Sequence, residues 1–474
     1  MSARRILAIA LAATGVLAAC GADESGSPTT EPDGPSGPTV VSTTPDHGTD
    51  GTDGPDGSTD PTPADGGWLG GEPEWGSLGD ADGGGERAGY DVAMAEAPSS
   101  GAADDVIGEP PVEPSAEQPA LRAGSVDDNA DFAGFLDYLA RIDSLGIPLR
   151  SVDPSGRIVV SVAGTTGLPV SGAEVVVSAA GGEVARLRTT ADGTARFHPA
   201  FYGAAADEYV FAVGGASATA APGGEVTIAA AEPGGASGAV PLDVLFLLDA
   251  TGSMGDEIDR LKTSIDSIAA RVDELAGAPD VRFAMTLYRD DGDAFVTATH
   301  DFTSDVAAFR AALAEVVADG GGDYPEALDE GLAEALMLPA WRDPTSTVQL
   351  VFLVADAPPQ VGRQVDQPYD QSIEVAIGRG TKIFPVASSD SDDQAEAVFR
   401  QLAQATGARF VFLSYGAGGA ATGGSSDITS TDYEELALDD LVVRLIAEEL
   451  AALTGDPGRV PPPTPTTTTV PPGQ

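Results

Sequence analysis

The apolar residues between about 240 and 454 follow two alternating spacings. The run Leu242–Leu248 is almost continuous in large apolar residues, which predicts a strand buried on both faces. Apolar residues then recur every three or four positions from Ile258 to Val272, as in an amphipathic helix. The same patterns predict further strands at 281–288, 294–299, 348–354, 382–387 and 408–413, and helices at 306–317, 325–338, 371–379, 393–405 and 434–453. Strands alternating with helices predict a Rossmann-like α/β domain over 240–454, with a doubly wound, mostly parallel sheet.

Between 155 and 231 the apolar period shortens to two. Strand-like runs at 158–162 and 173–177, with Asp192-Gly193 as a turn, predict a small all-β sandwich before the α/β domain. The segments Leu168–Ala173 and Thr189–Phe197 resemble the carboxypeptidase regulatory-like sandwich. That resemblance implies a spacer or adhesive unit. From the strand pattern we expect His198 to be a surface strand residue and not a ligand. Helical spacing before the sandwich predicts one further helix within 131–148, for which the pattern suggests no function.

The two ends of the chain have no apolar period. Residues 21–125 are an acidic Gly/Pro/Ser/Thr-rich stretch and 455–474 a Pro/Thr-rich one, and both predict disorder because they offer too little apolar surface to bury. The start of the chain joins Arg4 and Arg5 to an apolar run, which predicts a secretory signal over 1–20. Residues 17–20 resemble a bacterial lipobox, which implies lipidation of Cys20, the chain's single cysteine. We therefore expect lipid anchoring alone, on the extracytoplasmic face of a bacterial cell membrane.

The charge balance excludes one class of partner. The chain has 74 acidic against 24 basic residues and a formal net charge of -50. Binding nucleic acid requires basic patches that neutralise phosphates, so nucleic acid is not an expected partner. Membrane contact is expected through the N-terminal lipid only.

Oxygen-bearing side chains follow the predicted central strands. Asp249, Thr251 and Ser253 come directly after the strand 242–248, and Asp356 follows the strand 348–354. An open α/β sheet places its ligand site at the carboxyl ends of its strands. Asp323 lies in a glycine-rich loop between these two positions in the chain. Since hard divalent cations prefer oxygen ligands, these loops predict a cation site.

These loops also carry a family resemblance. Asp249–Met254, Gly320–Ala327 and Val354–Pro359, in this order on a strand–helix scaffold, resemble the von Willebrand factor type A (VWA) domain over the whole of 240–454. The resemblance implies a metal-ion-dependent adhesion site that usually holds Mg²⁺, with Mn²⁺ or Ca²⁺ as alternatives, and assigns Asp249, Thr251, Ser253 and Asp356 as ligands. The family usually has D-x-S-x-S in the first loop, and Thr251 preserves the hydroxyl. In the middle loop the family supplies a threonine where this chain has Asp323, and another carboxylate would weaken the metal's attraction for a partner's acidic residue.

Other interpretations of the same residues stay open. Asp249 and Ser253 could simply cap a helix, and Asp356 with the prolines after it could form an ordinary turn. A serine hydrolase would need a general base near Ser253, yet the three histidines are His47, His198 and His300, each predicted to lie elsewhere. A metal-dependent hydrolase is a weaker alternative still, and we expect no enzyme. The remaining alternative is a structural scaffold whose metal binds no partner.

Together these patterns predict a lipid-anchored cell-surface binding protein. Its VWA domain would hold a divalent cation and mediate adhesion to, or interaction with, an extracellular or envelope protein.

Overall fold

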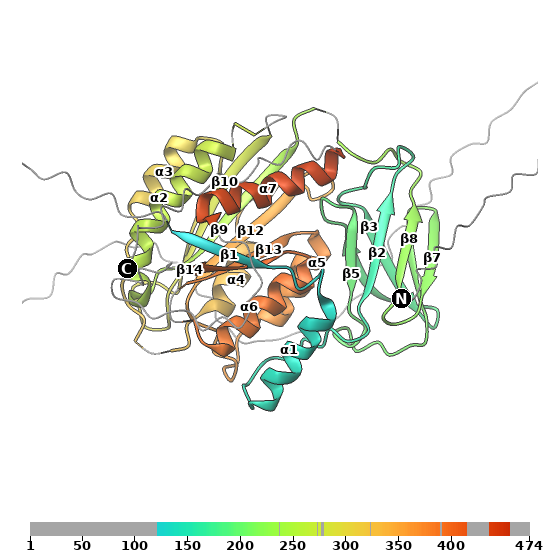
Figure 1. The fold of residues 1–474 in the computed structure, drawn as a ribbon, viewed down its shortest axis with the longest axis horizontal. Coiled ribbons are helices and arrows are strands. Elements are labelled where there is room, and N and C mark those ends of the chain that lie inside the picture. Colours follow the sequence, from blue (N-terminus) through green and yellow to red (C-terminus); the bar gives the residue numbers. More distant parts are fainter. Residues whose placement is uncertain are drawn as a thin grey trace, which may run out of the picture. The chain divides into compact units, whose positions relative to one another are not determined.

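The computed structural model describes residues 121–455, apart from 237, 273, 276–278, 323, 389–390, 415–435 and the side chain of Asp256. Its largest sheet has strand order β11-β10-β9-β12-β13-β14-β1-β15 (Figure 1). The bounds are β1 (Arg122–Val126), β9 (Pro241–Asp249), β10 (Asp280–Tyr288), β11 (Thr297–Thr303), β12 (Val348–Ala355), β13 (Lys382–Ala387), β14 (Phe410–Ser414) and β15 (Leu436–Ala437). The strands from β10 through β9, β12 and β13 to β14 pair in parallel. The strands β11, β1 and β15 pair antiparallel, so the sheet is mixed.

Helices cover both faces of this sheet, which explains why β12 is buried along its whole length. The helix α2 contacts α3 and α7, and α5 contacts α4 and α6 (Figure 1). Their bounds are α2 (Gly255–Val272), α3 (Val306–Ala314), α4 (Leu328–Met337), α5 (Tyr369–Arg379), α6 (Asp393–Thr406) and α7 (Leu438–Thr454), with a short 3₁₀ turn, η1 (Gly252–Met254), before α2. We refer to the large sheet and these helices as the head.

Residues 158–229 form two smaller sheets, which we call the two-sheet segment. One sheet has the order β5-β2-β8 and the other β4-β3-β6-β7. The bounds are β2 (Ile158–Ala163), β3 (Glu174–Ala179), β4 (Gly182–Arg188), β5 (Thr194–Phe197), β6 (Tyr209–Val213), β7 (Ala216–Ala220) and β8 (Glu225–Ala229). Alternate residues of β2 are buried, as expected for a strand with one face on a core.

The chain enters the head before it builds the two-sheet segment. Residues 122–125, expected to belong to the disordered linker, form most of β1, which lies between β14 and β15 in the large sheet. The predicted helix follows as α1 (Phe132–Ser144), whose Phe135, Tyr138 and Ile142 are buried. It packs against α6 of the head. Within the described residues, the large sheet of the head therefore contains one strand, β1, that precedes the two-sheet segment in the sequence, and seven strands that follow it.

A buried lysine joins the two-sheet segment to the head. Lys382, at the start of β13, is 4% exposed, and its Nζ donates to Glu449 of α7 at 2.7 Å and to Asp192 at 3.2 Å. Burial lowers the pKa of Lys382, but Glu449 and Asp192 outweigh that effect and raise it. The lysine is thus charged at neutral pH and is held by carboxylates from two parts of the fold.

The expectations about the two ends of the chain concern residues that the structure does not describe. The signal over 1–20, Cys20, the linker up to residue 120 and the tail from 456 onward all lie outside the described residues. Within residues 121–455, as far as they are described, no helix combines the length and apolar character needed to cross a bilayer.

His198 is buried, not on the surface as the strand pattern suggested. It is 2% exposed, and its Nε2 has no hydrogen-bond partner among the described residues. Burial, followed by the charges of Arg157 and Arg196, lowers the pKa of His198 to about 3. The imidazole is therefore neutral in the folded protein at pH values where an unfolded chain would protonate it.

This histidine predicts a pH dependence of stability. Between pH 6.5 and 3 the unfolded state binds a proton that the folded state does not, so stability is complete above pH 6.5 and falls on acidification. On going from pH 7 to pH 5, we expect the free energy of unfolding of His198→Gln to fall by about 2 kcal/mol less than that of wild type. Urea unfolding at the two pH values measures both losses. The exposed His300 provides the control, His300→Gln, which should keep the wild-type pH slope. Identical slopes for all three proteins would contradict the prediction.

Candidate metal site

The first loop of the candidate site is built by the end of β9. Asp249 is the last residue of that strand and is fully buried, as is Thr251. Asp249 Oδ1 accepts hydrogen bonds from the Thr251 backbone N–H at 3.0 Å and the Thr251 hydroxyl at 2.7 Å. The hydroxyl oxygens of Thr251 and Ser253 lie 3.0 Å apart. One carboxylate and two hydroxyls therefore meet in the turn between β9 and α2.

Asp356 joins them from the neighbouring strand. It follows β12, which pairs in parallel with β9 up to Val354 opposite Leu248, so the two aspartates emerge at the same edge of the sheet. Asp356 is 5% exposed. Burial, then the negative charge of Asp249, raises the pKa of Asp356 to about 7, while a hydrogen bond from Ser253 opposes the shift. The predicted first and third loops are thus brought together by the sheet.

Both carboxylates have an oxygen that the described residues leave without a well-aligned hydrogen bond. Asp249 Oδ2 and Asp356 Oδ1 are buried and have no hydrogen-bond partner of good geometry among the described residues, although the buried Tyr288 hydroxyl is close enough to Asp249 to lower the pKa of that carboxyl. Burial raises the pKa of Asp249 to about 6, even though the Thr251 hydroxyl and N–H lower it. Buried charges are normally paired or bound to metal, because removing an isolated carboxylate from water costs several kcal/mol. A proton or a cation would satisfy these two oxygens.

The middle loop is only partly described. Asp323, the predicted carboxylate of this loop, lies outside the described residues. The glycines before it pack tightly on the first loop, since the Gly320 carbonyl accepts from the Gly252 N–H at 3.0 Å. A Cβ on Gly321, whose φ is +68°, would lie 2.8 Å from the Cβ of Thr251. Only glycine fits there, so the loop is held directly against Thr251.

The structure adds Glu326 to this acidic centre. Its side chain is buried, and Glu326 Oε1 would lie 2.8 Å from a Cβ on Gly321, the same point that approaches Thr251. Burial, together with the charges of Asp249, Asp356 and Glu326, raises the pKa of Tyr288. Glu326 was missed from the sequence because a glutamate just before a helix is usually a solvated helix-end residue. Only the approach of the three loops places it here.

The donor set fits a hard divalent cation. Two carboxylates and two hydroxyls supply oxygen only, which suits Mg²⁺, Mn²⁺ and Ca²⁺. Within the described residues, no three acidic, histidine or cysteine side chains form a metal-binding group by themselves. A cation held by Asp249 and Asp356 would take its further oxygen ligands from the Thr251 and Ser253 hydroxyls and from water.

Among the described residues, no histidine is placed to act as a catalytic base for Ser253. His198 is buried in the two-sheet segment and His300 lies within β11, where it pairs with Met285 in the middle of β10. The hydroxyl of Ser253 instead interacts with Thr251 and Asp356. A nucleophilic serine needs a neighbouring base that is itself oriented by a third group. Among the described residues no such arrangement surrounds Ser253.

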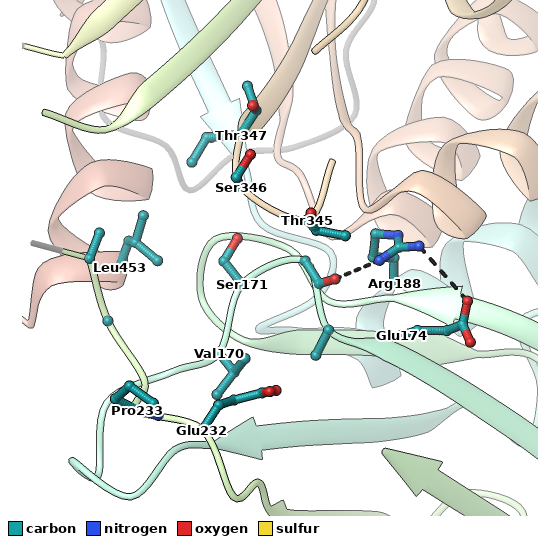
Figure 2. Close-up of a pocket in the computed structure, with 15 residues that line it drawn as sticks. Val170, Ser171, Glu174, Arg188, Glu232, Pro233, Thr345, Ser346, Thr347 and Leu453 are labelled. Atoms are coloured by element: carbon teal, nitrogen blue, oxygen red, sulfur yellow. Dashed lines mark hydrogen bonds and ion pairs between the residues drawn. The ribbon is translucent and has the colours of Figure 1, made fainter. Parts of the chain in front are cut away.

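A cavity elsewhere contains none of the predicted ligands. It has a volume of about 490 Å³ and lies between loops of the two-sheet segment and the residues that lead into β12 (Figure 2). Arg188 donates to the Gly172 carbonyl at 2.7 Å and forms an ion pair with Glu174 at 3.9 Å. The guanidinium is therefore committed to the cavity wall, and the cavity is better explained as an imperfectly packed boundary.

Residues 243–415 match the family model of the von Willebrand factor A domain, so the chain contains a VWA-type domain there. An ariadne-like RING finger protein of Acanthamoeba polyphaga mimivirus is 30% identical over 143 residues, which are 30% of this chain and 14% of that protein. The alpha-protein kinase vwkA of Dictyostelium discoideum is 31% identical over 118 residues, 25% of this chain and 18% of the kinase. The chain thus spans less than a fifth of the length of these curated relatives.

Similar solved structures include proximal thread matrix protein 1 from the mussel byssus, described also with a zinc-occupied MIDAS motif. It has 16% identity and a TM-score of 0.29, covering 35% of this chain and 40% of its own. The pilus adhesin SpaC from Lactobacillus rhamnosus GG has 12% identity and a TM-score of 0.27, covering 42% of this chain and 29% of its own.

Proposed function

We propose that this chain is a cell-surface binding protein whose VWA domain holds a divalent cation and engages a protein partner. One observation carries the proposal: Asp249 and Asp356, buried at the ends of adjacent parallel strands, each present an oxygen without a hydrogen-bond partner among the described residues. An ordinary helix cap would satisfy its carboxylate with backbone N–H groups and leave it solvated. Two desolvated carboxylates beside two hydroxyls support a cation site instead.

The ligands we assign are Asp249, Thr251, Ser253 and Asp356, with Asp323 as a further candidate from the middle loop. We propose Mg²⁺ as the ion, with Mn²⁺ or Ca²⁺ able to replace it at oxygen donors. When bound, the cation supplies an electrophilic centre that attracts a carboxylate of the partner. The Thr251 and Ser253 hydroxyls are neutral, so they leave more positive charge on the ion than carboxylates would. Asp323, if it ligates, would reduce that charge.

The cellular setting completes the proposal. Lipidation of Cys20 would hold the chain at the extracytoplasmic face of a bacterial cell membrane, and the acidic residues 21–120 would separate the head from the lipid. The partner we propose is an extracellular or envelope protein. The net charge of -50 argues against nucleic acid.

Two measurements test this function. Isothermal titration with Mg²⁺ and Mn²⁺ should give binding heat for wild type and none for Asp249→Ala. Capture of envelope proteins by the immobilised head should be lost on adding a chelator and restored by Mg²⁺. Absence of binding heat in wild type would refute the metal site. Metal binding with chelator-insensitive capture would refute metal-mediated adhesion and favour a scaffold role.

A further inference from the structure

Exposed large apolar side chains are unevenly distributed over the molecule. Among the described residues they are Leu145, Val210, Val317, Tyr324, Met337 and Leu338. Four of these six fall within 317–338, the middle loop and α4. Met337 and Leu338, at the end of α4, are 64% and 63% exposed. Contiguous exposed apolar surface, unlike scattered single residues, marks interaction sites.

Met337 and Leu338 line a groove of about 630 Å³, which we call the α4 groove. It lies between α4, the start of β11 and residues 365–367. Its apolar lining also includes Val296, Ala333 and Val365. The groove is therefore a concave, largely apolar surface, which a flat exposed helix end would not provide.

The rim of the α4 groove is acidic. Four of its eleven lining residues are Asp or Glu and none is basic, whereas acidic residues make up 74 of the 474 in the chain. The four are Asp291, Glu330, Glu334 and Asp366. The groove lining is thus more than twice as rich in acidic residues as the chain as a whole.

Few cations of the protein itself neutralise this rim. Arg363 forms ion pairs with both Asp291, at 3.1 Å, and Glu330. Glu334 accepts hydrogen bonds from the Thr297 and Thr299 hydroxyls. In the part of the chain that the structure describes, neither Glu334 nor Asp366 has an ion pair. Arg363 therefore neutralises two of the four carboxylates at most, and a cation from a partner would find an attractive potential beside the other two.

The α4 groove begins beside the candidate metal site. Asp291 comes three residues after Tyr288, the end of β10, whose neighbour in the sheet is Asp249. Just before α4, the Glu326 N–H donates to the Pro358 carbonyl at 3.2 Å, two residues after Asp356. A partner that reaches the metal site would therefore lie next to the start of the groove.

We propose that the α4 groove docks a partner segment that combines an apolar side chain with lysine or arginine. The apolar side chain would pack on Met337 and Leu338, and the cation would lie among Asp291, Glu330, Glu334 and Asp366. Burial of the apolar side chain supplies affinity, while the charges select the partner and speed encounter. This inference rests on the proposed binding role of the head and specifies the chemistry of the partner.

The test uses a short fluorescent peptide carrying leucine and arginine in a glycine–serine background, with fluorescence polarisation as the readout. Matched peptides replace arginine by glutamate or leucine by serine. We expect the leucine–arginine peptide to bind wild type, and the double variant Met337→Ser, Leu338→Ser to bind it at least about tenfold more weakly. Asp366→Asn should weaken binding about twofold to fivefold and reduce its salt dependence.

Control variants remove equivalent groups elsewhere on the surface. Leu145→Ser removes an apolar side chain that is 56% exposed on the residue ending α1, and Asp259→Asn removes an 84% exposed carboxylate on α2. Both should bind as wild type does. Equal binding by the groove variants and these controls, or equal binding of the glutamate peptide, would overturn the proposal. Circular dichroism of each variant checks that it is folded.

The metal is kept separate by measuring in EDTA, in Mg²⁺ and with Asp249→Ala. The α4 groove should bind the peptide under all three conditions, even if the metal proposal fails. Conversely, calorimetry could show Mg²⁺ binding while the groove variants bind the peptide as wild type does. That result would overturn the proposed docking role of the α4 groove and leave the proposed metal site intact.

Discussion

Replacing Asp249 with asparagine is expected to stabilise the metal-free protein and to abolish its stabilisation by Mg²⁺. The asparagine side chain would keep an acceptor oxygen for the Thr251 hydroxyl and N–H, which now donate to Asp249 Oδ1. Its amide group would replace Oδ2, which has no partner among the described residues, and would remove a buried charge beside Asp356. In EDTA at pH 8 we expect a gain on the order of 2–3 kcal/mol in the free energy of unfolding.

The gain should depend on pH in a defined direction. Burial raises the pKa of Asp249 to about 6 in the folded state, against an unfolded value of 3.8. A raised carboxyl pKa favours the folded state most below pH 4, and that contribution is lost as the pH rises through 6. The advantage of Asp249→Asn in EDTA should therefore grow from pH 4 to pH 7. Denaturant unfolding across this range measures it.

Magnesium should reverse the ranking of the two proteins. At a free Mg²⁺ concentration about a hundred times Kd, wild type should gain about 2.7 kcal/mol, whereas Asp249→Asn should gain nothing. Asp259→Asn, on the exposed face of α2, is the matched control and should stay within about 0.5 kcal/mol of wild type under both conditions. If Asp249→Asn destabilised the metal-free protein and still responded to Mg²⁺, the carboxylate would be a structural cap.

Replacing Lys382 with methionine is expected to destabilise the protein by about 3–5 kcal/mol. Methionine fits the aliphatic part of the side chain but leaves Glu449 without the donor that now lies at 2.7 Å. Burial already raises the pKa of Glu449, and Lys382 is the main group that opposes this. Asp192 should be affected less by the loss of the lysine, because the Thr190 and Thr194 hydroxyls also donate hydrogen bonds to its carboxylate.

The other lysine of the chain offers the control. Lys262 lies on α2 and pairs at 3.3 Å with Asp259, whose side chain is 84% exposed, so Lys262→Met should cost no more than about 1 kcal/mol. Adding Glu449→Leu to Lys382→Met should recover much of the loss, because an apolar pair replaces a buried unpaired charge. Equal losses for the two lysine variants in urea unfolding would rule out a stabilising role for the buried cluster.

The order of strands and helices in the head was largely predictable because it depends on local spacing. The strand expected at 382–387 is β13 with those bounds, and the helix expected at 393–405 is α6 with one residue more. Errors arose at element ends. The helix predicted from 325 begins at Leu328, and the helix predicted over 306–317 ends at Ala314. Ends depend on single hydrogen bonds, which spacing does not report.

Long-range pairing was not predictable. A five-residue strand at Arg122–Val126 carries too little pattern to be recognised, and its place between β14 and β15 depends on residues about 280 to 315 positions away. His198 was misjudged for a related reason. An alternating pattern predicts which residues share a face, but the loops that cover that face belong to the tertiary structure.

The candidate site divides in the same way. Asp249, Thr251, Ser253 and Asp356 could be chosen from the chain alone, because polar residues that follow apolar strands mark the carboxyl edge of a sheet. Their burial, the unsatisfied oxygens of the two aspartates and the entry of Glu326 could not, since each depends on three loops meeting over one edge. Local patterning is encoded within a few residues, whereas desolvation and charge coupling arise only when distant segments exclude water together.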